Sequence, residues 1–137
     1  MKTIPDSNVL FDIILRDPVW CDWASQKFLA CKAEDQLIVN TVVFAEVGGH
    51  FTSQKETFEA FQSMGSVLEE IPWDAAYLAG RAYRAYRRSG GLRDRLLPDF
   101  LIGAHAAVKG YRVLTRDQAR YRTYFPEVEV IAPDTHP

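Results

Sequence analysis

The sequence contains few of the residues that mark specialised classes of protein. Its 137 residues include two cysteines, Cys21 and Cys31, and three histidines. Both cysteines fall in a stretch with helical spacing, where their separation corresponds to about 15 Å of rise, which is too far for a mutual disulfide. Because no CxxC pair is present either, the two thiols indicate ordinary core residues in a reducing compartment.

Long apolar runs and an excess of one charge are also absent. No run approaches the ~18 apolar residues of a membrane span, and Asp6 and Asp12 interrupt the apolar start of the chain, unlike a signal peptide. The net charge is only -2, so any binding of nucleic acid must come from a local patch. These absences predict a soluble, cytoplasmic protein.

What the chain does have is a normal globular composition and alternating secondary-structure signals. Hydrophobic residues make up 47% of it, which fits one domain over residues 1–137. Short apolar runs predict strands at residues 2–5, 37–39, 67–71, 112–115 and 128–131. Helical spacing and capping residues predict helices at residues 7–15, 18–33, from 42, about 55–64, 74–88, 98–109 and 118–125. This alternation predicts a three-layer α/β/α sandwich around a mostly parallel sheet.

Four acidic residues lie where such a sheet would gather them. Asp6 follows the first predicted strand, Glu46 lies in the helix after the second, and Asp117 follows the strand at 112–115. Asp99 lies in the first turn of the helix that begins near Pro98. Because ligands of open parallel sheets bind beyond the carboxyl ends of the strands, we expect these four carboxylates to share one site.

Each of the four carboxylates also has an ordinary structural interpretation. Asp6 and Asp117 suit helix N-caps, and Asp99 suits the positive end of its helix. Glu46 is harder to explain in this way, because it lies among apolar residues in the segment VVFAEV and an unpaired buried carboxylate is costly. Either Glu46 faces a shared polar pocket, or it occupies an exposed position on a short helix.

Gathered carboxylates repel one another and raise each other's pKa unless a cation intervenes. Oxygen ligands without histidine or cysteine suit a hard cation, Mg²⁺ or Mn²⁺. The histidines, His105 among them, are interpreted as structural or exposed residues. Such a cation can activate water and neutralise charge on a phosphate, so the acids Asp6, Glu46, Asp99 and Asp117 predict metal-assisted hydrolysis of a phosphodiester bond.

The segments around these acids resemble the PIN-domain family, and in particular the VapC-like toxins of bacterial toxin–antitoxin pairs. The matching segments are residues 4–10 (IPDSNVL), 39–47 (VNTVVFAEV), 97–106 (LPDFLIGAHA) and 113–117 (VLTRD). They follow one another in the family's order and cover nearly the whole chain. Ser7 stands where the family more often has threonine, so the hydroxyl is kept.

The resemblance implies the same three-layer fold and a Mg²⁺- or Mn²⁺-dependent endoribonuclease. It implies that Asp6, Glu46, Asp99 and Asp117 hold the metal directly or through water, and that Asn8 and Thr115 are supporting polar positions. Proteins of this kind usually form homodimers and are inhibited by a small antitoxin protein. The expected partners are therefore RNA, a cognate antitoxin and a second copy of the chain.

Arginines near the acidic residues are candidates for holding the RNA backbone. Arg84 and Arg88 share a face of the helix at residues 74–88, Arg93 continues the basic run towards Asp99, and Arg116 adjoins Asp117. A basic stripe beside a metal pocket suits a phosphate backbone. A solvated arginine face, or a surface for an antitoxin or a second copy, is the alternative.

Two rival functions follow from the same residues. A phosphatase of the haloacid-dehalogenase type also has an aspartate after its first strand, but it needs a second aspartate two residues later, where this chain has Asn8. A non-catalytic PIN-like module that binds RNA or protein would keep the fold without needing four carboxylates. A comparison of metal binding by the wild type and an Asp99→Ala variant would separate this module from a nuclease.

Overall fold

A computed structural model describes residues 1–92 and 97–137 of the chain. Its centre is a five-stranded sheet in the order β3-β2-β1-β4-β5, with every neighbouring pair parallel. The strands are β1 (Thr3–Pro5), β2 (Leu37–Val39), β3 (Ser66–Leu68), β4 (Arg112–Leu114) and β5 (Val130–Ile131). The fully parallel sheet confirms the expected sheet type, and β1 lies in its middle.

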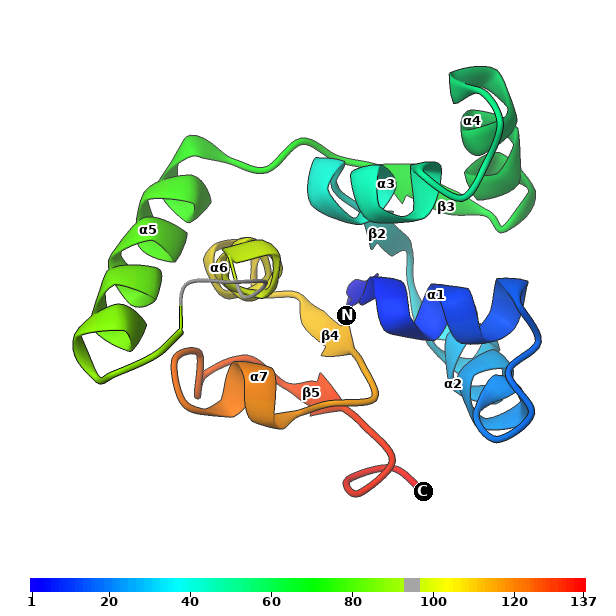
Figure 1. Cartoon of the computed structure of the whole chain (residues 1–137). Coiled ribbons are helices and arrows are strands. Elements are labelled where there is room, and N and C mark those ends of the chain that lie inside the picture. The colour runs from blue at the N-terminus through cyan, green and yellow to red at the C-terminus, as the bar shows by residue number, and fades with distance from the viewer. Residues whose placement is uncertain (93–96) are drawn as a thin grey trace.

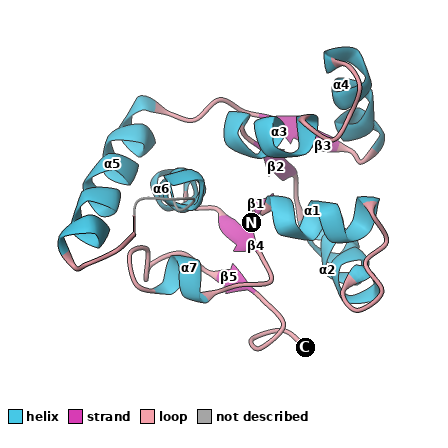
Figure 2. Ribbon diagram, viewed as in Figure 1, coloured by secondary structure: helices cyan, strands magenta, loops and turns pink. Residues whose placement is uncertain are grey.

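Seven helices are assigned in these residues. They are α1 (Ser7–Ile14), α2 (Cys21–Glu34), α3 (Thr41–Gly48), α4 (Gln54–Ser63), α5 (Trp73–Arg88), α6 (Leu97–Lys109) and α7 (Ala119–Arg122). Helices α1 and α2 cover one side of the sheet, whereas α5 and α6 cover the other (Figure 1). Figure 2 shows the strands enclosed between these helical layers. The three-layer α/β/α sandwich predicted from the sequence is confirmed.

Element boundaries differ from the predicted ones by a few residues, and one difference has a clear cause. The second helix was expected from residue 18 but begins at Cys21. The Asp17 carboxylate accepts hydrogen bonds from the backbone N–H groups of Val19 (2.9 Å) and Trp20 (2.8 Å). This local turn satisfies those donors outside the helix and delays its first turn.

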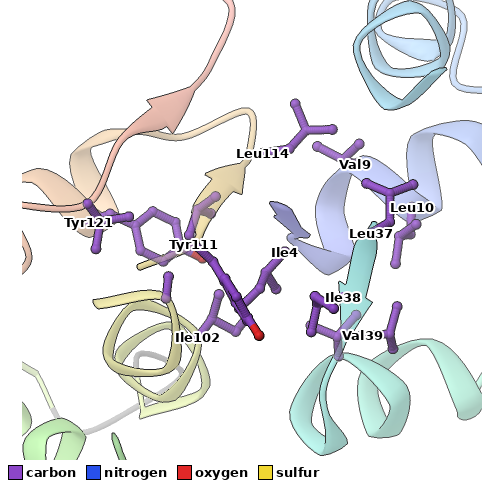
Figure 3. Close-up of a cluster of buried hydrophobic side chains, with 14 of the residues drawn as sticks. Ile4, Val9, Leu10, Leu37, Ile38, Val39, Ile102, Tyr111, Leu114 and Tyr121 are labelled. Carbon is purple, nitrogen blue, oxygen red and sulfur yellow. The ribbon is translucent and has the colours of Figure 1, made fainter. Parts of the chain in front are cut away.

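Apolar side chains on both faces of the central strands form the core. Every residue of β1, β2 and β4 is buried, and Ile4, Leu37 and Leu114 are at most 1% exposed. Figure 3 shows these side chains packed with Val9 of α1 and Ile102 of α6. Because the strands are held on both faces, the residues that follow their carboxyl ends have fixed positions.

A buried polar chain connects α6 to the start of α3. His105 has no exposed surface, and its ring nitrogens lie 3.1 Å from Asn40 Nδ2 and 2.7 Å from Glu69 Oε2. The Asn40 side chain also accepts a hydrogen bond from Val43 N, which makes Asn40 the N-cap of α3. The structural interpretation of His105 is confirmed, and its contacts fix the helix that carries Glu46.

Both cysteines lie in the described residues and both are free, with Cys31 buried and Cys21 partly exposed. Within the described residues, no helix has the combination of length and apolar character needed to cross a membrane.

The close approach of α6 to the segment after α7 gives a test of the packing. A Cβ added at Gly103 would lie 2.4 Å from the ring of Phe125, which is 1% exposed. Gly103→Ala is expected to lower the free energy of unfolding by about 1–3 kcal/mol through overpacking. Gly80→Ala in α5 is the matched control, because its Cβ would meet nothing within 4 Å. It should be neutral or stabilising by about 0.5–1 kcal/mol. Urea denaturation of both variants measures the contrast, and equal stabilities would contradict it.

Candidate active site

Asp6 is the buried centre of the candidate site. It is 1% exposed and follows β1 directly, with its N–H donating to Leu114 O at 2.8 Å. Its Oδ2 accepts hydrogen bonds from Thr115 Oγ1 at 3.0 Å and from Tyr121 OH at 2.7 Å, and Ser7 Oγ lies 3.5 Å from its Oδ1. Although Asp6 is the N-cap residue of α1, its side chain makes no capping bond. The capping interpretation of Asp6 therefore fails.

Asn8 and Thr115 connect the two loops that carry the aspartates. Thr115 Oγ1, which donates to Asp6, accepts from Asn8 Nδ2 at 3.2 Å and from Asp117 N at 3.1 Å. Asn8 Oδ1 in turn accepts from Arg116 N at 3.3 Å. These bonds join the segment after β1 to the segment after β4. The two polar positions thus lie beside the acids, in the arrangement expected of supporting residues.

The pKa of Asp99 is affected by the other three predicted acids. It lies in the first turn of α6 and is 7% exposed. Its pKa is raised from 3.8 to about 7, first by burial and then by the negative charges of Asp6, Glu46 and Asp117, against the opposing effect of Arg120. Since these charges act on one carboxyl group, the fold brings the four predicted acids to one end of the sheet.

Glu46 lies at the rim of this group and not within it. Its side chain is exposed on α3, which is the second of the two positions considered for it from the sequence. Its pKa is nevertheless raised, first by partial loss of surrounding water and also by the charge of Asp6, whereas the Ser7 hydroxyl lowers it. Glu46 is therefore near enough to act on the same ligand while remaining open to solvent.

Arg120 lies between two of the acids. Its Nε donates to Asp117 Oδ2 at 3.1 Å, and its Nη1 lies 3.5 Å from Asp99 Oδ1. Burial lowers the pKa of the guanidinium, but the charges of Asp99, Asp6 and Asp117 outweigh this effect and raise it. This contact was not predicted from the sequence, although Asp117, just before α7, and Arg120, within it, are only three residues apart.

Asp117 and Tyr121 complete the geometry. Asp117 Oδ1 accepts from Ala119 N at 3.2 Å. The N-cap of α7 is Gln118, so Asp117 forms a local turn before the helix and is not the N-cap considered for it from the sequence. Tyr121 is fully buried, and burial followed by the charges of Asp6 and Asp99 raises its pKa well above 10.0. Its hydroxyl is therefore a permanent donor to Asp6. No motif in the sequence distinguished Tyr121 from an ordinary core aromatic residue.

A protein-family match identifies this fold. Residues 3–126 match the PIN domain family. The chain belongs to the PIN domain family. The resemblance noted in the four sequence segments is confirmed. PIN domains are nucleases, so the reaction class indicated by the carboxylates, hydrolysis of a phosphodiester bond, is the one that the family carries out.

Solved structures of toxin–antitoxin complexes share this PIN fold. The chain is similar to VapBC2 from Rickettsia felis bound to a promoter DNA fragment, with 13% identity, a TM-score of 0.72, and coverage of 96% of this chain and 98% of that chain. It is also similar to FitAcB from Neisseria gonorrhoeae, with 18% identity, a TM-score of 0.70, and coverage of 98% of this chain and 99% of that chain. A toxin–antitoxin complex from Klebsiella pneumoniae has 20% identity and a TM-score of 0.67, with coverage of 96% of this chain and 97% of that chain. No curated protein matches the chain in a sequence search.

The donor chemistry of this PIN domain fits a hard cation, although the acids are not pre-arranged as a metal cage. In residues 1–92 and 97–137, no three histidine, cysteine or acidic side chains form a group that could hold a metal ion. The groups available are carboxylate oxygens with hydroxyl groups behind them, which suit Mg²⁺ or Mn²⁺. Arg120 already supplies positive charge between Asp99 and Asp117, which is the neutralising role that a bound cation would take over.

The candidate RNA-binding arginines lie in different environments. Arg84 and Arg88 are exposed on α5. Arg116 pairs with the buried Asp12, with Nε 2.6 Å from Oδ2, and its guanidinium lies 5.7 Å from the centre of the Trp20 ring. These contacts give Arg116 a structural role that competes with RNA binding. Arg93 lies outside the described residues. RNA binding by these arginines stays a prediction.

The raised pKa of Asp99 gives a test of the site in metal-free protein. Between pH 3.8 and about 7 the folded state holds a proton that the unfolded state releases, so the contribution of Asp99 lowers stability as pH rises through this window. Asp99→Asn removes that effect. In the presence of a chelator, it should raise the melting temperature more at pH 8 than at pH 5. The matched control Asp74→Asn, at an exposed position in the first turn of α5, should give the same difference at both pH values. A pH-independent effect of Asp99→Asn would contradict the assignment.

Proposed function

We propose that this PIN domain is a Mg²⁺- or Mn²⁺-dependent endoribonuclease and acts as the toxin of a toxin–antitoxin pair. The observation that carries the proposal is the buried Asp99, whose pKa is raised to about 7 by burial and by three further carboxylates. Such a group is unfavourable for a structural role alone and favourable for holding a cation. Membership of a nuclease family supports the same reaction.

In the proposed mechanism, Asp6, Asp99 and Asp117 would hold the cation, which when bound would activate water and neutralise charge on the phosphate. The hydroxyl groups of Thr115 and Tyr121 fix the Asp6 carboxylate through Oδ2. These two bonds leave the other face of the Asp6 carboxylate for the ligand. Asn8 supports Asp6 indirectly, because its Nδ2 donates a hydrogen bond to Thr115 Oγ1.

Glu46 and Arg120 have roles that follow from their exposure. Glu46 is open to solvent at the rim and has a raised pKa, which suits a carboxylate that orients the attacking water or accepts its proton. Arg120, which is 40% exposed, can leave Asp99 when a cation binds and then pair with a phosphate oxygen of RNA. An attack by water does not use the RNA 2′-hydroxyl, so the products carry 5′-phosphate and 3′-hydroxyl ends.

The rival functions have less support. The second aspartate of a haloacid-dehalogenase phosphatase is replaced by Asn8, and the chain belongs to the PIN family. A non-catalytic PIN-like module keeps the fold but gives no reason for a buried carboxyl beside three others. Its signature would be metal-independent RNA binding without cleavage.

Cleavage of a labelled RNA gives a graded test of these roles. Asp6→Asn and Asp99→Asn should each reduce the cleavage rate by more than the roughly 10–100-fold typical of a change behind a metal ligand. Tyr121→Phe, which removes one hydroxyl and keeps the ring, should fall within that roughly 10–100-fold range. The exposed control Asp74→Asn should cleave at the wild-type rate.

Chelation should abolish cleavage, and Mg²⁺ or Mn²⁺ should restore it. End-mapping of cellular RNA after induced expression should find 5′-phosphate ends and identify the target. Cleavage that resists a chelator, or products that end in a 2′,3′-cyclic phosphate, would overturn the proposed mechanism.

The proposed partners are an antitoxin protein and a second copy of the chain. Support for the antitoxin comes from the solved structures with the same fold, which are toxin–antitoxin complexes. When the chain is co-expressed with the small protein encoded beside it, the two should co-purify and RNA cleavage should be inhibited. Light scattering on the free chain measures the homodimer expected from the resemblance. Separate elution of the two proteins, with cleavage undiminished, would contradict the antitoxin assignment.

A further inference from the structure

A cavity adjoins the candidate active site on the side of α5. It has a volume of about 370 Å³ and is formed by the end of α5, the start of α6 and helix α7. These three helices lie together on one side of the molecule in Figure 1. Six of the residues that line the cavity matter for its chemistry: Tyr86, Ser89, Gly91, Asp99, Arg120 and Tyr124. Asp99 therefore belongs both to the acidic group and to the cavity wall.

Aromatic rings form one wall of this cavity. The ring centres of Tyr86 and Tyr124 are 6.2 Å apart and their planes are nearly perpendicular. Phe100 lies behind both, at 5.6 Å from Tyr86 and 5.2 Å from Tyr124, and it is only 4% exposed. Tyr86 and Tyr124 are half-buried, so they present aromatic surface to the cavity from a fixed support. Such surfaces stack on nucleobases of any sequence.

The Tyr86 ring is held in place by the turn that ends α5. Its hydroxyl accepts a hydrogen bond from Leu92 N at 3.0 Å. A Cβ at Gly91 would lie 2.4 Å from the ring, so only glycine lets the backbone approach it this closely. The Arg87 guanidinium fixes the same turn by donating to Gly91 O at 2.8 Å. The aromatic wall is therefore preformed and needs no rearrangement to accept a planar ligand.

A positively charged side chain also lines the cavity. The Arg120 guanidinium is partly exposed on the cavity wall and lies beside Asp99. A base stacked on the tyrosines would carry its own phosphate towards Arg120 and the carboxylates. The phosphate of a nucleotide in this cavity would then lie next to the group that is proposed to hold the cation.

We propose that this cavity binds one nucleobase of the RNA strand, that of the nucleotide adjoining the cleaved bond, against the aromatic wall formed by Tyr86 and Tyr124. The identification of RNA as the ligand rests on the proposed ribonuclease function. An apolar anchor side chain of a protein partner is the other occupant that would fit the space. The position of Arg120 and the absence of sequence preference in stacking favour RNA.

Equilibrium binding in the presence of a chelator tests the cavity without cleavage. The probe is a fluorescein-labelled RNA hexamer of mixed sequence, followed by anisotropy with the full chain. Tyr124→Leu should weaken binding about tenfold, which corresponds to about 1.4 kcal/mol. Tyr124→Phe keeps the ring and should bind as the wild type does. The matched control is Tyr77→Leu, because Tyr77 is 70% exposed on α5 and does not line the cavity.

Photo-crosslinking keeps the test decisive if Tyr124→Leu does not fold. The same hexamer carrying 4-thiouridine should crosslink the wild-type chain at Tyr86 or Tyr124. Crosslinks confined to the exposed Trp73 and Tyr77, or unchanged affinity of a folded Tyr124→Leu variant, would overturn the proposal. Unchanged RNA affinity together with weakened binding of the antitoxin by Tyr124→Leu would assign the cavity to a protein anchor.

These outcomes separate this inference from the proposed function. If the wild type binds the hexamer through Tyr124 but does not cleave RNA when Mg²⁺ or Mn²⁺ is supplied, the cavity assignment stands and the nuclease assignment falls. If RNA is cleaved at equal rates and equal KM by wild type and Tyr124→Leu, the nuclease assignment stands and the cavity assignment falls.

Discussion

A carboxylate buried at the end of the central strand is the constraint on which the site depends. Asp6 is 1% exposed, and a charged group in that position is tolerated only where donors surround it. Those donors come from the far end of the chain, Thr115 after β4 and Tyr121 in α7. The need to satisfy one carboxylate therefore fixes how the C-terminal segments pack against the first strand.

Once Asp6 is fixed, the remaining charges must be accommodated around it. Asp99 is buried beside it and responds with a pKa raised to about 7, whereas Asp117 and Glu46 remain accessible to water. Arg120 reduces the repulsion by contacting Asp99 and Asp117 together. The site thus combines Asp6, which is held by hydrogen bonds, Asp99, which has a raised pKa, and two acids that are accessible to water. This arrangement leaves part of the carboxylate surface open to a cation.

Much of this could be predicted from local patterns, and the rest depended on contacts between distant segments. Alternating apolar runs predicted every strand and helix, and the position after each strand predicted where the acids gather. The roles of Arg120 and Tyr121 could not be predicted in the same way. An arginine and a tyrosine on a one-turn helix have no periodic signal. Although Asp117 is near Arg120 in the sequence, the contacts that join these residues to Asp99 and Asp6 span 21 and 115 residues. For Glu46, the apolar neighbours left two positions open, one facing a shared polar pocket and one exposed on a short helix, and its side chain is exposed.

The parallel sheet also determines when activity can arise during synthesis. Strand β1 pairs with β4, and the hydroxyl groups that hold Asp6 belong to residues 115 and 121 of a 137-residue chain. Such non-local pairing forms late, because the intervening segment must be ordered first. A nascent chain that has emerged only as far as α5 contains Asp6 and Glu46 but neither Asp99 nor Asp117. The ribosome must therefore synthesise the chain at least as far as Tyr121 before the four acids and the donors to Asp6 can come together.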